Sequence, residues 1–310
     1  MKPVILLFWT TGLVCGAGPA ERTLSGEAPV RTIAFAPDGK TLVASYTDQH
    51  VRTWDLVTGK VVGDQPNGGF LLSSKILVEP SPDRQSLHVW DLAAARQRYT
   101  IDKRVAHATA SPDAQQLAIS SERSIQLVDA ATGALRKTLP DGIGGAATLL
   151  FSPDGGSVVS ANYDNDVRVW SSRSGELLRK MEDFTGAMFA AAFTPDGRQL
   201  VMGGLDETVY IFDTRTYSLQ RKLTGHGETI LALAISPDGR TLVTGGFDVL
   251  TTKNPSKLVF WDLPAGVIQR TVRAPHAVTA LEFAPDGKWV AMAVAGGKEI
   301  SLIPLAPATN

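Results

Sequence analysis

Two short landmarks recur along this sequence at a fixed spacing, and no other feature constrains its fold as strongly. The first is an apolar residue, then one small residue, then Pro-Asp-Gly, as in Phe35-Ala-Pro-Asp-Gly39. The second is an alternating segment that ends in an aromatic residue and usually an aspartate, as in Trp54-Asp55. The first landmark recurs at Phe151, Phe193, Ile235 and Phe283, with a weaker copy at Ala110, and the second at Trp90, Trp170, Phe212 and Trp261, with degenerate copies at Val128 and Ile303.

The spacing shows that the landmarks belong to one repeating unit. Pro37 lies 17 residues before Trp54, and two further units keep this distance. Positions of the second landmark run from 54 to 303 in seven copies, an average period of 41.5 residues. The sixth unit is about seven residues longer, with the extra residues within 249–257. Internal repeats of this length predict an array of similar structural units.

The second unit contains a misleading copy of the first landmark. Ser81-Pro-Asp83 resembles it, but Pro82 lies only 8 residues before Trp90. We therefore predict that 80–85 is the turn between the second and third strands of this unit, and that residues 73–75 form its first turn.

Each unit reads as four short strands. Segments such as Val167-Arg-Val-Trp170 alternate between apolar and polar residues, which is typical of half-buried strands. Pro-Asp-Gly suits a tight turn, because proline presets φ and glycine accepts a positive φ. A single four-stranded sheet cannot bury both of its faces, whereas sheets stacked around an axis can.

This repeat resembles the WD-repeat family, and the resemblance covers essentially everything after residue 20. It implies an all-β, seven-bladed β-propeller of four-stranded antiparallel blades, closed by an N-terminal strand that completes the last blade. Arg22-Thr23-Leu24 is the natural donor of that strand. Residues 21–310 then form one domain, with blades at about 30–65, 66–100, 101–140, 141–182, 183–224, 225–272, and 273–305 together with 21–25.

The first twenty residues differ from the repeats. Lys2 precedes a short apolar stretch, Val4–Val14, and small residues follow it. This arrangement predicts a secretory signal peptide over 1–20, and hence a secreted or periplasmic protein. Two alternatives are a lipid anchor on Cys15, the one cysteine, and an uncleaved tail on a cytoplasmic protein. The apolar stretch is too short to span a bilayer.

Charge and motifs exclude several classes of function. The net charge of −1 argues against a nucleic-acid binder, which usually carries a basic face. We expect no metal or cofactor, because no phosphate-binding loop, paired cysteines or shared histidine pattern is present. Residues 162–166 resemble the start of a calcium loop, but Val167 and Arg173 replace its required glycine and glutamate.

The resemblance also assigns a structural role to one group of polar residues. WD repeats contain a hydrogen-bonded tetrad of His, Ser or Thr, Asp and Trp. The sixth blade matches it with His226, Thr244, Asp248 and Trp261, and the fourth matches in part with Ser160, Asp164 and Trp170.

The same residue types allow a hydrolase interpretation. Thr244 would then be the nucleophile, beside His226 and Asp248. The spacing favours the structural interpretation, because it follows the tetrad of the family.

Binding is therefore the predicted function: a non-enzymatic scaffold, monomeric, that binds a protein or peptide on one face. In this family the turns between second and third strands share a face with the links into each first strand. Candidate contact residues on that face are Thr47, Tyr163, Leu205 and Phe247 from the turns, with Met188 and Phe189 from a link. The insertion at 249–257 extends from the same face. The alternative is a propeller enzyme, a hydrolase, lyase or dehydrogenase, with its site at the mouth of the central channel.

Overall fold

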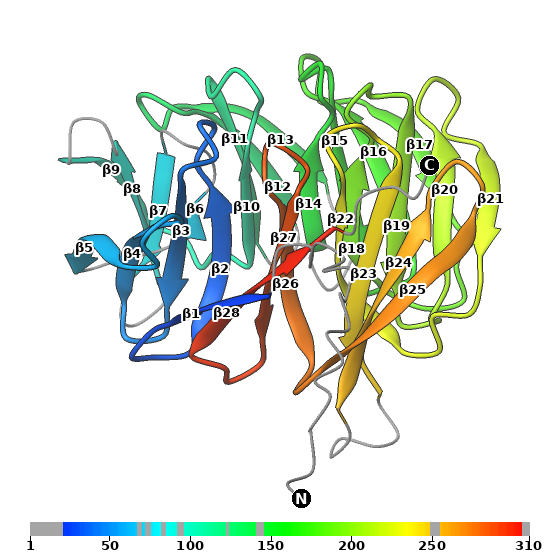
Figure 1. Ribbon diagram of the computed structural model, residues 1–310. Helices are drawn as coiled ribbons and strands as arrows, with labels where there is room; N and C mark the ends of the chain where they lie inside the picture. The colour runs from blue at the N-terminus through cyan, green and yellow to red at the C-terminus, as the bar shows by residue number, and fades with distance from the viewer. Residues whose placement is uncertain are drawn as a thin grey trace, which may run out of the picture.

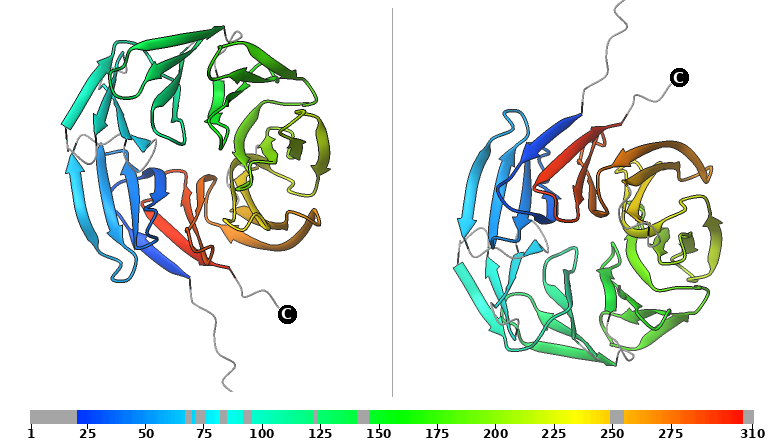
Figure 2. Two further views of the ribbon diagram at one scale, coloured as in Figure 1. Left: turned by 90° about the horizontal axis from the view of Figure 1, so that it is seen from above. Right: turned by 90° about the horizontal axis from the view of Figure 1, so that it is seen from below.

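The chain folds into seven four-stranded antiparallel sheets that stand around a central axis (Figures 1 and 2). The computed structural model describes residues 21–66, 70–71, 76–81, 85–91, 96–121, 124–140, 146–248 and 255–305. These residues form strands and turns and contain no helix. The predicted all-β, seven-bladed architecture is therefore confirmed.

Each sheet is one blade, and the first strand of each blade lies nearest the axis. Blades 1 to 6 are consecutive runs of four strands, and blade 7 takes its fourth strand from the N-terminus. The strands are β1 (Arg22–Ser25), β2 (Val30–Phe35), β3 (Thr41–Tyr46), β4 (His50–Asp55), β5 (Val61–Pro66), β6 (Phe70–Leu71), β7 (Ile76–Pro80), β8 (Leu87–Asp91), β9 (Arg96–Ile101), β10 (His107–Ala110), β11 (Gln116–Ser121), β12 (Ser124–Asp129), β13 (Leu135–Pro140), β14 (Ala146–Phe151), β15 (Ser157–Asn162), β16 (Val167–Ser171), β17 (Leu177–Met181), β18 (Met188–Phe193), β19 (Gln199–Gly204), β20 (Val209–Asp213), β21 (Leu219–Leu223), β22 (Thr229–Ile235), β23 (Thr241–Phe247), β24 (Ser256–Asp262), β25 (Val267–Ala274), β26 (Val278–Phe283), β27 (Trp289–Val294) and β28 (Glu299–Pro304).

The antiparallel order divides the turns between two faces. Turns between second and third strands, such as 163–166, form the lower face in Figure 1. Turns between first and second strands, and between third and fourth strands, form the upper face. The two faces are called lower and upper below.

The Pro-Asp-Gly landmark forms the first turn of its blade. In blade 4, Oδ1 of Asp154 accepts hydrogen bonds from the Ser152 hydroxyl at 2.6 Å and from the amide of Gly156 at 2.9 Å. Gly155 has a φ of 70°, which a residue without a Cβ adopts at little cost. Ala114 occupies the same position in the weaker copy and has a φ of 57°.

The recurring aromatic residues lie between neighbouring blades. Trp170 is 3% exposed and packs with Leu127 and Leu139 of blade 3 as well as with Val158 of its own blade. Trp261 bridges blades 5 and 6 in the same way. Burial of an aromatic side chain contributes about 2–3 kcal/mol, so these contacts hold adjacent sheets together.

The N-terminal strand closes the ring as the sequence predicted. β1 pairs with β28, and Leu24 lies opposite Ile300. Leu24 is 3% exposed and packs against a core shared with Trp54 of blade 1. One short strand therefore joins the last blade to the first.

Blade 2 confirms the placement of its middle turn, because β7 ends at Pro80 and β8 begins at Leu87. In blade 6, residues 248–255 join β23 to β24, where blade 4 uses only 163–166. Several predictions lie outside the described residues: the signal peptide with Cys15, the turn at 73–75, and residues 249–254 of the insertion.

Candidate functional site

Two of the recurring tryptophans donate to a hydroxyl on the second strand of their own blade. Nε1 of Trp261 donates to Oγ1 of Thr244 at 2.9 Å, and Nε1 of Trp170 donates to Oγ of Ser160 at 3.2 Å. Thr244 and Ser160 are both fully buried. These bonds satisfy indole N–H groups that burial would otherwise leave unpaired.

His226 does not continue this chain of hydrogen bonds. Its side chain is fully buried, and Nδ1 lies 2.9 Å from the backbone oxygen of Glu228. Burial lowers the pKa of His226 to about 4, so the ring is neutral at pH 7 and Nδ1–H donates to that oxygen. Within the described part of the chain, Nε2 has no hydrogen-bond partner. The Nδ1 bond therefore fastens the segment that leads into β22, and the full tetrad of His226, Thr244, Asp248 and Trp261 stays a prediction.

The hydrolase interpretation fails at the same residues. The Thr244 hydroxyl accepts from Trp261 and lies 3.5 Å from the backbone oxygen of Val259, to which it donates. No hydrogen bond joins it to His226 among the described residues. A nucleophile needs a base within hydrogen-bond reach and access for a substrate, and Thr244 has neither.

Blade 1 uses a different acceptor, which the sequence did not predict. Nε1 of Trp54 donates at 2.9 Å to the hydroxyl of Tyr46, two positions along the strand from Ala44. Ala44 pairs with Arg52 just as Ser160 pairs with Arg168, so it occupies the serine position and has no hydroxyl. The Tyr46 side chain is fully buried and takes over the role.

The turn aspartates of the lower face bind a residue four positions later. Arg52 donates to Oδ2 of Asp48 at 2.8 Å, and the Tyr210 hydroxyl donates to Oδ2 of Asp206 at 2.6 Å. The spacing Asp-x-x-x-Arg is visible in the sequence at Asp48 and Asp164, but the prediction did not use it. Each pair fixes its turn on the third strand.

Asp164 belongs to the same pattern and not to a tetrad. Its Oδ2 accepts from Arg168 at 3.0 Å, and Asp166 accepts from the same guanidinium at 2.5 Å. Nζ of Lys180 lies 3.5 Å from Asp166. Two cations therefore already occupy the segment that resembled a calcium loop, and burial, with the nearby Asp164 carboxylate, raises the pKa of Asp166.

Three predicted contact residues present side chains on the lower face of blades 4 and 5. Tyr163 is 56% exposed and Leu205 is 47% exposed. Phe189 is half-buried, and its ring centroid lies 6.3 Å from that of Tyr163. We call Tyr163, Phe189 and Leu205 the lower patch.

The other predicted contact residues lie elsewhere. Met188 is 1% exposed and packs in the core between blades 4 and 5, so its prediction as a surface contact was wrong. A β-bulge accompanies this difference, because the register of β18 shifts between Met188 and Ala190 and leaves Phe189 as the extra, unpaired residue. Phe247 is half-buried in blade 6, and Thr47 is exposed in blade 1, across the ring from the lower patch.

Two further observations concern the described residues alone. They contain no group of three or more His, Cys, Asp or Glu side chains placed to hold a metal ion. None of them belongs to a helix that could cross a membrane.

A family model described as "WD domain, G-beta repeat" matches four segments: 18–55, 135–171, 175–213 and 217–248. The chain contains WD repeats. Three of the matched segments begin near the fourth strand of one blade and continue into the next, as 135–171 runs from β13 through β16. The repeat in the sequence is therefore offset by one strand from the blade in space. The same offset places β1 in the last blade.

Proposed function

We propose that this chain is an exported, non-enzymatic scaffold that binds a protein or peptide through its lower face. WD repeats support an interaction scaffold in general. The observation that carries the proposal further is the lower patch, in which Tyr163 and Leu205 remain about half exposed on short turns.

The patch has the properties of an interaction anchor. Tyrosine is enriched among residues that dominate binding energy, because it offers a large surface at low conformational cost. The turns that carry it are held firmly: the amide of Leu205 donates to Ala187 at 2.9 Å, and Asp206 accepts from Tyr210. A partner would therefore meet a preformed surface and would not have to order it.

Affinity capture after crosslinking in the native host tests this proposal. The wild type is compared with a Tyr163→Ala/Leu205→Ala double variant. A matched control is Val57→Ala/Val267→Ala, which removes aliphatic side chains that are 83% and 56% exposed near the upper face. We expect partners to be lost with the first variant and kept with the control. Equal recovery from all three proteins would reject the lower patch.

Export requires a separate test, because it depends on residues 1–20. Mass spectrometry of the mature protein from the native host should find a chain that begins shortly after Ala17 or Ala20. A chain that retains the apolar stretch would contradict the export proposal and leave the binding proposal standing.

A further inference from the structure

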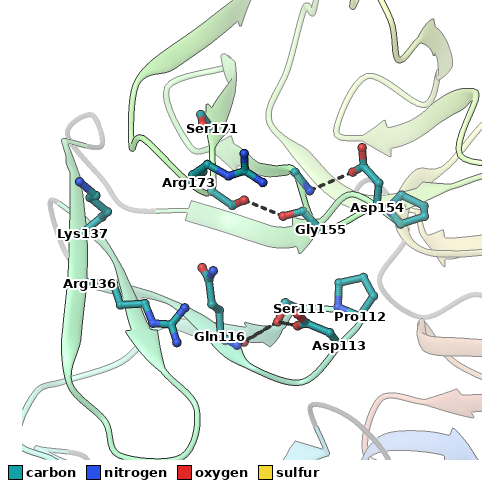
Figure 3. Close-up of a pocket in the computed structure, with 13 residues that line it drawn as sticks. Ser111, Pro112, Asp113, Gln116, Arg136, Lys137, Asp154, Gly155, Ser171 and Arg173 are labelled. Atoms are coloured by element: carbon teal, nitrogen blue, oxygen red, sulfur yellow. Dashed lines mark hydrogen bonds between the residues drawn. The ribbon is translucent and has the colours of Figure 1, made fainter.

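A pocket of about 810 Å³ opens on the upper face between blades 3 and 4 (Figure 3). The first turns of the two blades form one side of it, with Asp113 and Asp154. Strand β13 contributes Arg136 and Lys137 on the other side, and the turn after β16 contributes Arg173. It lies on the face opposite the lower patch, so it is a separate site.

Two other joints between blades are bridged by an arginine at the position that Lys137 occupies here. Lys137 pairs with Leu127, one residue before the recurring landmark position, and Arg221 and Arg270 have the same register in blades 5 and 6. Arg221 donates to the backbone oxygen of Pro264 at 2.8 Å, and Arg270 donates to that of Pro304 at 2.8 Å. Lys137 makes no such bond within the described part of the chain.

A glycine in the turn after β16 leaves room for the side chain of Lys137. Gly175 has a φ of 79°, and in blade 5 the same place in the turn is taken by Tyr217 with a φ of 51°. Tyr217 packs against the apolar core between blades 4 and 5. A Cβ on Gly175 would lie 3.5 Å from Cδ of Lys137, so the lysine stem lies over the glycine.

The three cations of the pocket are not equivalent. Arg136 is bonded to Asp129 at 2.5 Å, and this bond lowers the pKa of Asp129. Lys137 and Arg173 are exposed, and neither has a carboxylate within 4.0 Å among the described residues. They are available to an anionic ligand.

The two carboxylates of the pocket are committed to their own turns. Asp113 accepts from the Ser111 hydroxyl at 2.6 Å, and this bond lowers its pKa. Asp154 makes the equivalent bond with Ser152. In Figure 3 both aspartates lie across the pocket from Lys137, so positive and negative charge are separated along it.

Gln116 adds a polar group that needs a partner. Its side chain projects into the pocket in Figure 3, and its Oε1 is buried without a hydrogen bond in the described structure. An unpaired buried amide oxygen costs about 1–3 kcal/mol. Because this oxygen is covered, a ligand N–H group would satisfy it once the Gln116 side chain turns further into the pocket.

We propose that this pocket binds an acidic peptide segment of a partner protein. The carboxylate of an Asp or Glu side chain would lie between Lys137 and Arg173, and a main-chain N–H would donate to Gln116. A peptide supplies both groups, whereas a simple anion supplies only the first. The site gives the propeller a second contact, on the face away from the lower patch.

Fluorescence polarisation with labelled hexaglutamate and hexaglutamine tests the proposal on the whole protein. We expect the wild type to bind hexaglutamate about tenfold or more tightly than hexaglutamine at low salt, with loss of affinity as salt screens the charges. Lys137→Glu/Arg173→Glu should weaken hexaglutamate binding by about tenfold or more. The control Lys60→Glu/Lys288→Glu makes the same change in net charge at exposed sites elsewhere and should alter binding less than about twofold.

A second variant changes the shape of the site and leaves its charge unchanged. Gly175→Tyr copies the blade 5 turn into blade 4 and places a ring where the Lys137 stem lies, so it should abolish hexaglutamate binding with every cation retained. The proposal is overturned if the wild type does not prefer hexaglutamate, or if the control weakens binding as much as the pocket variant. It is also overturned if Gly175→Tyr, folded by circular dichroism, binds like the wild type.

Discussion

The indole Nε1 of Trp261 donates a 2.9 Å hydrogen bond to Oγ1 of Thr244, and neither side chain is more than 1% exposed. The bond lies inside blade 6, while the ring of Trp261 packs toward blade 5. A single residue therefore links the interior of one sheet to the joint with the next.

Removal of the acceptor should destabilise the protein. Thr244→Val keeps the shape of the side chain but leaves the buried indole N–H unpaired, so the free energy of unfolding should fall by about 1–3 kcal/mol. Urea denaturation measures the change. In a Thr244→Val/Trp261→Phe double variant the N–H is gone as well. Its loss of stability should be smaller than the sum of the losses in Thr244→Val and Trp261→Phe alone. A loss equal to that sum would show that the bond contributes nothing.

Truncation of a ring between blades should be more severe. Trp170→Ala opens a cavity between blades 3 and 4, and the expected loss is about 3–5 kcal/mol. The measurement is the urea midpoint. Trp170→Phe should retain most of the packing and lose less, and an unchanged midpoint for the alanine variant would contradict the placement of the ring.

Closure of the ring should depend on one leucine. Leu24→Ala removes a side chain that packs between Trp54 and Ile300, with an expected loss of about 2–5 kcal/mol. Thr23→Ala, on the exposed side of the same strand, should change stability by less than about 0.5 kcal/mol. Similar melting temperatures for the two variants would refute the role of Leu24.

The irregular first turn of blade 3 offers a stabilising change. Ala114 has a φ of 57°, where five other blades have glycine. Because a left-handed conformation costs a residue with a Cβ about 1–2 kcal/mol, Ala114→Gly should raise the free energy of unfolding by up to about that amount. Gly155→Ala in blade 4 should show the reverse change. A loss of stability in Ala114→Gly would show that the turn is unstrained.

Glu282 should make stability depend on pH. It lies on β26, at a position that carries an apolar residue in blades 1, 4, 5 and 6, and its Oε1 accepts from the amide of Phe35 at 3.4 Å. Burial raises its pKa to about 7 from an ordinary value of 4.5. The folded protein therefore holds a proton that the unfolded chain loses between pH 4.5 and 7.

The sign follows from this difference. The free energy of unfolding should fall as the pH rises through this window, by up to about 3 kcal/mol, and should be lowest above pH 7. Urea denaturation at pH 5 and pH 8 measures it. Glu282→Gln cannot ionise and should lose this part of the pH dependence; a variant with the same dependence as the wild type would exclude Glu282 as its source.

The sequence predicted the fold well because its signals are local and repeated. Pro-Asp-Gly sets a turn by itself, and an alternating strand before each aromatic shows which side is buried. The sequence also located the turn of blade 2, since a wrong choice would have broken the spacing. It did not predict that Asp164 binds Arg168 or that His226 binds the backbone oxygen of Glu228, because a side chain's choice among nearby partners depends on three-dimensional distances.

By itself the sequence determined the number of blades, the strand that closes the ring and the residues that lie between blades. These follow from periodicity, which every copy of the repeat carries. Only the tertiary structure decided that Met188 is buried while Tyr163 is exposed, and that Lys137 and Arg173, which lie on neighbouring blades, line one pocket. Blades meet through residues about 40 positions apart, and no local pattern records which side chain of one blade fills the space beside the next.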